Sequence, residues 1–216
     1  MFQWDSPLMT FLRTLCNYIF VTILMAICSI PLVTCGAALC AGYDTVRRYL
    51  VREEGSHAAG VFFKSFARNF KQSAVIWLIL AAICIVFWQG TRVMDALALE
   101  GIAPRVLEAM LIIGMFLCLA VLLVALASVA RFNNSVGMLL KNSLLLCIMN
   151  FWRLVVLLVV IGVAVLLVRL IPPVILIAPS LVVFYWYRCM EKIFAPYLPE
   201  DARANAVQGN PDEPDE

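Results

Sequence analysis

The feature that most constrains this chain is a run of thirty residues without a charged side chain, residues 14–43, which Pro31 divides just past its middle. A straight helix of that length would be about 45 Å long, whereas the hydrocarbon core of a bilayer is about 30 Å thick. Proline removes a backbone donor and clashes with the preceding turn, so we expect the first helix to stop at or just before Ile30. The sequence therefore predicts a membrane-spanning helix over residues 8–30, then a proline elbow that includes Gly36. A second, less apolar helix follows and leaves the membrane carrying basic charge.

Composition supports a membrane protein. Hydrophobic residues make up 64% of the chain and charged residues 14%, against about 45–50% and about 25% in soluble domains. A soluble protein of 216 residues could not bury that much apolar surface. We therefore predict an all-α fold, a polytopic transmembrane helical bundle over residues 1–197, followed by an acidic, disordered cytoplasmic tail over residues 198–216.

Four further apolar stretches complete a predicted bundle of about five spans: residues 72–91, 109–130, 154–168 and 173–187. In the third stretch, thirteen of fifteen residues are Leu, Ile or Val. At about −0.3 to −0.6 kcal/mol each near the membrane centre, they favour insertion by roughly 4–8 kcal/mol.

Two further prolines shape the last part of the bundle. Pro172 lies in a tight turn between the last two spans, and Pro179 is expected to kink the final one. With Pro31 and Gly36, they are the predicted structural elbows of the chain.

The distribution of Lys and Arg predicts the orientation. Residues 44–71 and 131–153 carry most of the basic side chains near the spans, whereas residues 90–105 and 169–172 carry few. Because basic loops stay on the cytoplasmic side, the two basic segments and the C-terminus are predicted to be cytoplasmic, in the plasma membrane of a bacterium.

The alternative is six spans, with residues 31–49 crossing the membrane as well. Asp44, Arg47 and Arg48 disfavour it, because each would cost about 2.5–3.5 kcal/mol at the membrane centre.

Residues 62–71 have the pattern of an amphipathic helix. Four phenylalanines fall on one side of a helical wheel, while the polar and basic side chains occupy the remainder. Such a helix lies in the membrane interface or against a partner; the alternative is that it packs on this protein's own bundle. The residues predicted to contact lipid or a partner are Arg47, Arg48, Phe62, Lys64, Phe66, Arg68, Asn69 and Phe70.

The sequence shows no pattern of a catalytic, cofactor or metal site. The lone His57 has no second ligand beside it, the eight cysteines include no C-x-x-C pair, and neither G-x-S-x-G nor a phosphate-binding glycine loop occurs. We predict a protein that is not an enzyme, without cofactor or metal. Nucleic acid is a poor candidate partner, because no compact surface of basic and aromatic residues exists outside the predicted spans.

Three segments resemble the YesL family, small integral membrane proteins of bacteria of unknown function. They are Asp5-Ser6-Pro7, the elbow P-x-x-T-x-G-A-A over residues 31–38, and F-x-x-N-F-K-Q over residues 66–72. The resemblance covers about residues 1–190. Members are typically encoded beside carbohydrate ABC importers and glycan-degrading enzymes, so the resemblance implies an accessory membrane subunit of a sugar uptake system. It brings no catalytic residues.

The leading expectation is therefore a non-enzymatic protein that binds the permease subunits of a carbohydrate ABC importer. In this role the phenylalanines would supply apolar contact, and the arginines and Lys64 would meet lipid phosphates or partner carboxylates. The alternatives are an independent small-solute transporter or channel, and a self-associating homo-oligomer.

Overall fold

The computed structural model describes residues 7–51, 57–97, 101–132 and 134–197. Within them all regular secondary structure is helical, which confirms the predicted fold class. The predicted disordered tail lies outside the described residues. The elements are α1 (Pro7–Cys28), η1 (Leu32–Thr34), α2 (Cys35–Thr45), η2 (Val46–Val51), α3 (Ala58–Leu97), α4 (Ile102–Arg131), α5 (Val136–Met149), α6 (Phe151–Leu170), η3 (Pro172–Leu176), α7 (Ala178–Phe194) and η4 (Ala195–Tyr197).

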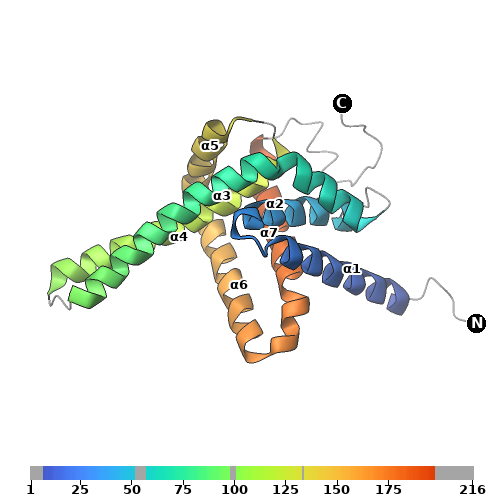
Figure 1. Cartoon of the computed structure of the whole chain (residues 1–216), viewed down its shortest axis with the longest axis horizontal. Coiled ribbons are helices and arrows are strands. Elements are labelled where there is room, and N and C mark those ends of the chain that lie inside the picture. The colour runs from blue at the N-terminus through green and yellow to red at the C-terminus, as the bar shows by residue number, and fades with distance from the viewer. Residues whose placement is uncertain (1–6, 52–56, 98–100, 133, 198–216) are drawn as a thin grey trace, which may run out of the picture.

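The helices form three arms that meet at one body (Figure 1). The long antiparallel pair α3 and α4 projects to one side, α6 and the start of α7 form a second hairpin, and α1 projects in a third direction. Helix α2 lies where they meet and contacts α1, α3, α4 and α7. From the sequence we expected α2 to leave the membrane and lead away from α1. In the structure α2 is instead enclosed by the other helices.

Small side chains allow α2 to occupy this central place. A Cβ at Gly36 would collide with Trp77 Cβ and lie 2.8 Å from the Ser73 carbonyl oxygen, so α2 and α3 touch almost backbone to backbone. A Cβ at Gly42 would collide with Met25 of α1. Helices in a membrane pack closely where such small residues face a neighbour.

The predicted proline elbow is confirmed. Helix α1 ends at Cys28, two residues before Ile30. The Thr34 hydroxyl donates to the Cys28 carbonyl oxygen at 2.6 Å, one of the acceptors that a helix end leaves free. Trp77 Nε1 of α3 donates to the Leu32 carbonyl oxygen at 2.9 Å. A side chain within the elbow and one from α3 therefore hold the turn in place.

Helix α3 differs from the prediction of a short surface helix followed by a separate span. It is one continuous helix of 40 residues, roughly 60 Å long. The change from basic to apolar sequence near Gln72 carries no glycine or proline, so nothing in the backbone ends the helix there. Its partner α4 is buried on all sides from Ala120 to Ala130 and exposed nearer its N-terminus.

The predicted kink at Pro179 is wrong. Pro179 lies in the first turn of α7, where proline needs no backbone donor, and the helix runs on from there to Phe194. Pro172 begins the 3-10 segment η3, which forms the turn between α6 and α7, so the expected turn is present.

Three helices, α3, α4 and α6, are long and apolar enough to cross a membrane. Two shorter apolar helices lie over Leu15–Cys28 and Val136–Met149. The predicted number of spans and their orientation remain predictions.

Candidate functional site: a buried charged centre beside apolar grooves

The first candidate site is an ion-pair cluster at the end of α2, formed by Asp44, Arg47, Arg48 and Arg68; we call it the Asp44 cluster. Arg48 Nε lies 3.2 Å from Asp44 Oδ1, Arg68 Nη2 lies 3.3 Å from Oδ2, and Arg47 Nη1 lies 3.9 Å from Oδ1. The Asp44 side chain is only 2% exposed. A buried carboxylate is tolerated when it is paired and hydrogen-bonded, and the three guanidinium groups supply both.

The chain builds the Asp44 cluster from local spacing and one distant contribution. Arg47 and Arg48 follow Asp44 by three and four residues, the spacing that places side chains on one helix face. They lie in η2, a π-helical segment, and π turns occur frequently at functional sites. Arg68 comes from α3, which packs against α2. The Asp44 cluster therefore fixes the start of α3 to the end of α2.

A second ion pair, between Arg131 of α4 and Glu191 of α7, lies close enough to Tyr43 of α2 to interact with it electrostatically. Arg131 Nη1 is 3.1 Å from Glu191 Oε1, and the guanidinium carbon lies 5.5 Å from the centre of the Phe194 ring. The Tyr43 ring packs against the Trp186 ring at a centroid distance of 4.8 Å, with the two ring planes tilted by 54°. Burial raises the pKa of Tyr43 above its usual value, because the ionised phenolate would lose its hydration. Within the described part of the chain, neither Tyr43 Oη nor Trp186 Nε1 has a hydrogen-bond partner.

The arginines of the predicted contact set therefore meet a carboxylate of their own chain. From the sequence we expected Arg47, Arg48 and Arg68 to meet lipid phosphates or the carboxylates of a partner; in the structure each lies beside Asp44. Lys64 is exposed on α3. Contact of these residues with lipid or a partner stays a prediction.

The phenylalanines of the predicted amphipathic helix do not all face lipid or a partner, as we had expected. Phe62 is fully buried in the core, so the apolar contact predicted for it is made within the chain. Phe66 and Phe70 are half-buried and continue the row, with ring centroids 6.2 Å and 5.5 Å apart along it. Phe63 is the exposed member, at 51%. Of the alternatives for this helix, packing on the protein's own bundle accounts for Phe62.

Asn69 is also buried, and its amide donates to the Ser65 hydroxyl at 3.2 Å. Ser73, one turn further, donates to the Asn69 carbonyl oxygen at 2.7 Å. These residues form a polar stripe on the buried side of α3. Small polar side chains on a buried helix face allow close packing and hydrogen bonds between helices.

Two apolar grooves flank α6. The first has a volume of about 510 Å³ and is lined by residues of α1, α2, α4, α6 and α7, among them Met25, Leu123, Ile161 and Trp186. The second, about 480 Å³, lies between α4 and α6. Both fall in the range of about 300–1,000 Å³ that is usual for ligand pockets. Among the described residues, their walls are apolar apart from Arg169 in the first groove and the Cys147 thiol in the second.

The sequence did not lead us to predict that Asp44 binds three arginines, or that Arg131 pairs with Glu191. The spacing of Asp44 from Arg47 and Arg48 was a usable signal for the first. The second joins residues sixty positions apart, which no local pattern shows. Among the described residues, no group of three or more His, Cys, Asp or Glu could hold a metal ion.

The fold and these sites define an all-helical protein with three helices that could cross a membrane and a charged centre at one end of the bundle. Residues 14–89 match the family described as "Protein of unknown function, DUF624". The match contains the elbow and the whole Asp44 cluster, whereas Arg131, Glu191 and α6 lie outside it. No curated protein and no solved structure matches the chain.

Proposed function

We propose that the protein is a non-enzymatic accessory protein of the YesL type in the bacterial plasma membrane, where it binds the permease subunits of a carbohydrate ABC importer. The DUF624 match is consistent with the YesL resemblance, from which the importer is inferred. In this proposal the basic end faces the cytoplasm and the apolar arms lie in the bilayer.

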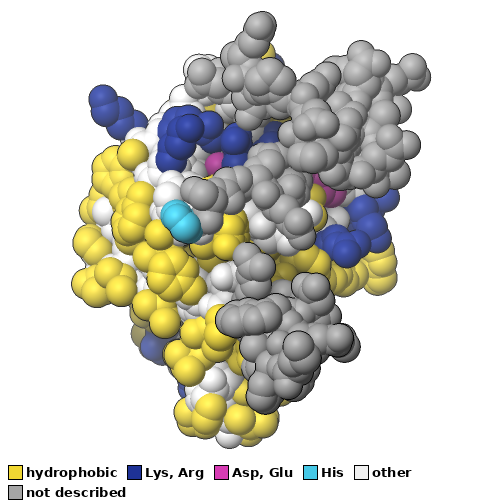
Figure 2. Space-filling model, turned by 90° about the vertical axis from the view of Figure 1, so that its right-hand side faces the viewer, with side chains coloured by type: hydrophobic (Ala, Val, Ile, Leu, Met, Phe, Trp, Pro, Cys, Tyr) yellow, Lys and Arg dark blue, Asp and Glu magenta, His cyan; other side chains and the backbone are white. Residues whose placement is uncertain are grey.

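The observation that carries the proposal is how the charges are distributed. Lys and Arg side chains gather over the upper part of the face in Figure 2, while hydrophobic side chains cover much of the rest. In the Asp44 cluster the arginines form ion pairs with a carboxylate of the same chain. The arms expose apolar residues such as Val86, Ile113 and Val163. Such a molecule offers surfaces for contact with lipid or other membrane helices and little polar chemistry of its own.

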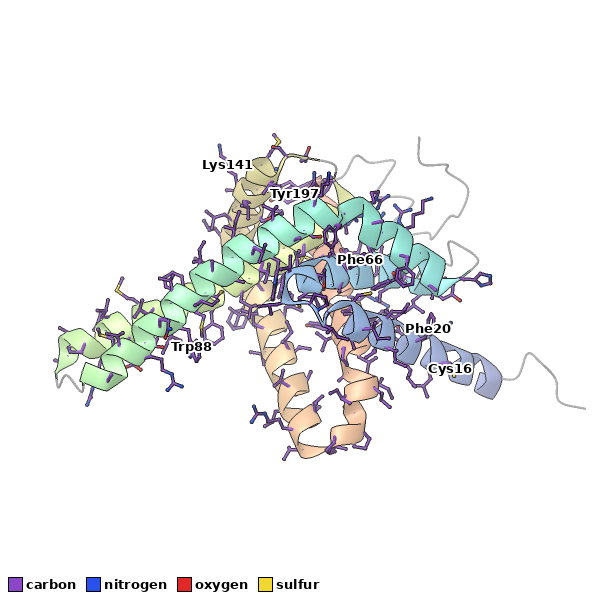
Figure 3. The ribbon with its side chains drawn as sticks, in the orientation of Figure 1. Cys16, Phe20, Phe66, Trp88, Lys141 and Tyr197 are labelled. Carbon is purple, nitrogen blue, oxygen red and sulfur yellow. The ribbon has the colours of Figure 1, made fainter. Side chains whose placement is uncertain are left out.

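The surface proposed for the permease is the exposed side of the first part of α3. Phe63, Lys64 and Lys71 are exposed there. Phe66, which Figure 3 labels, is half-buried. An apolar ring beside two cations suits a permease loop that carries a carboxylate.

The test is extraction of the tagged full-length protein from its own host in mild detergent, with the co-purifying proteins identified by mass spectrometry. Importer permeases are expected with the wild type and lost with the double variant Phe63→Ser/Lys64→Gln. The matched control Val86→Ser/Arg92→Gln, on the other end of α3, should retain them. Recovery of the protein without any permease would contradict the proposal.

The orientation has its own test. The variant Lys64→Cys, in a chain whose native cysteines are all replaced, carries one thiol. A membrane-impermeant maleimide should label this thiol only after the cells are opened. Labelling in intact cells would place the basic end outside and remove the cytoplasmic docking surface.

A second candidate function, an independent small-solute transporter or channel, is favoured by the Arg131–Glu191 pair. Ionisable side chains inside a membrane bundle are frequently part of a transport path, and the side chains of this pair are only 7% and 19% exposed. Solute flux into proteoliposomes that contain only this protein, abolished by Glu191→Gln, would favour this candidate over the accessory role. A homo-oligomer of fixed size on crosslinking would favour self-association.

A further inference from the structure

The outer side of the α6–α7 hairpin has a small pocket that is distinct from the sites above. Its volume is about 190 Å³, and it is lined by Trp152, Arg153, Val156, Tyr185, Arg188, Cys189 and Lys192. Three of these side chains are cationic and two are aromatic. Within the described residues, no acidic side chain lines the pocket and none forms an ion pair with its three cations.

The order of residues along α7 matches the layers of a membrane surface. Leu181, Tyr185, Arg188 and Lys192 follow at spacings of four, three and four residues, so they share one face of the helix. All four are exposed. Over roughly 16 Å this face changes from apolar to aromatic to cationic. Hydrocarbon, interface and headgroups follow in the same order in a bilayer.

The antiparallel helix α6 repeats this order in the opposite chain direction. Val163 and Val156 are exposed one above the other, seven residues apart, and Trp152 and Arg153 follow. Trp152 is 75% exposed, unusual for a large aromatic side chain in contact with water alone. Both helices thus place an apolar, an aromatic and a cationic layer side by side.

Contacts within the hairpin position two of the three cations, Arg153 and Arg188. Arg153 Nη1 donates to the Lys192 carbonyl oxygen at 2.9 Å and to Asn150 Oδ1 at 3.1 Å, which joins the start of α6 to the end of α7. The guanidinium carbon of Arg188 lies 5.3 Å from the centre of the Phe184 ring. The pocket lies towards the end of α7 that continues to Tyr197, which Figure 3 places at the same end of the molecule as Lys141.

We propose that this pocket binds the phosphate of an anionic phospholipid, whose acyl chains lie along the exposed valines of α6 and Leu181 of α7. Basic pockets between membrane helices bind anionic headgroups through charge, and the aromatic side chains fix the depth. Arg153, held by its backbone contact, forms the fixed wall, whereas Arg188 and Lys192 reach the phosphate. This site does not depend on the importer and would exist in either proposed function.

The test compares binding of phosphatidylglycerol and phosphatidylcholine with matched acyl chains to the full-length protein in detergent, measured by native mass spectrometry. The wild type should prefer phosphatidylglycerol. The double variant Arg188→Gln/Lys192→Gln should bind it about 25-fold more weakly, because each cation near an anionic surface contributes about fivefold. Binding of phosphatidylcholine should not change.

The matched control is Arg92→Gln/Arg105→Gln, which removes two exposed cations at the far end of the α3–α4 arm. It includes an arginine that lies over an aromatic ring, Arg92 on Trp88 at 5.5 Å, as Arg188 does on Phe184. This control should bind phosphatidylglycerol as the wild type does. Should the pocket variant unfold, Lys192→Gln alone gives the same test with an expected loss of about fivefold.

Three outcomes would overturn the proposal. They are the absence of any preference for phosphatidylglycerol, an equal loss in the pocket variant and the control, and displacement of the lipid by inorganic phosphate at the same concentration.

Discussion

Helices α2 and α6 contrast in a way that is instructive for a protein of this class. Fourteen of the twenty residues of α6 are Leu, Val or Ile, yet only Leu154 and Leu157 are buried. Helix α2 contains Gly, Ala, Cys and a charged residue, and nine of its eleven residues are buried. In a soluble protein the more apolar helix would be expected at the centre. In these two helices burial does not follow hydropathy. Small residues such as Gly36 and Gly42 let α2 approach its neighbours closely, and lipid solvates the large apolar side chains of α6 as well as a protein core does.

The largest effect is expected at the charged end of α2. Asp44→Asn would leave three arginines around an uncharged group, and breaking a buried ion pair costs about 3 kcal/mol or more. Arg169→Gln, at the end of α6, removes an exposed charge and should change stability by less than about 0.5 kcal/mol. Unfolding in mixed micelles by a denaturing detergent measures both. Equal losses would show that the charged end of α2 has no special structural role.

The second prediction concerns glycine on the two helices. Gly36→Leu forces a side chain into Trp77 and the backbone of α3, and overpacking of this kind costs about 1–3 kcal/mol. At Gly162 of α6 an added Cβ meets nothing within 4 Å, so Gly162→Leu should be neutral or stabilise the helix by up to about 1 kcal/mol. Thermal unfolding in detergent compares the two. Tolerance of leucine at both positions would refute the size argument.

The smallest effect is expected at the elbow before α2. Thr34→Val removes the hydroxyl that donates to the Cys28 carbonyl oxygen and should cost about 1 kcal/mol. Thr91→Val is the control, since its hydroxyl donates within α3 to the exposed Trp88 carbonyl oxygen. The same unfolding assay applies, and a loss at Thr91 as large as that at Thr34 would show that the elbow bond adds nothing.

Much of the candidate site lay beyond what sequence patterns predict. A helical wheel places Phe62 and Phe66 on one face, but it does not say what that face meets; α3 packs on the bundle, so Phe62 is inside. Pro179 was expected to kink a helix because the start of α7 cannot be read from an apolar sequence. The polar stripe of α3 and the pocket of α6 and α7 depend on which helices lie together.

The sequence by itself determined the all-helical class, the apolar helices suited to a membrane, and the elbow at Pro31. These follow from local rules, since proline and long uncharged runs act within a few residues. Only the tertiary structure decided that α2, with its small residues, is at the centre, that Arg68 reaches Asp44, and that Arg131 meets Glu191. The reason is that contacts between helices depend on the shape and polarity of two distant faces at once, and neither face is specified by its own segment alone.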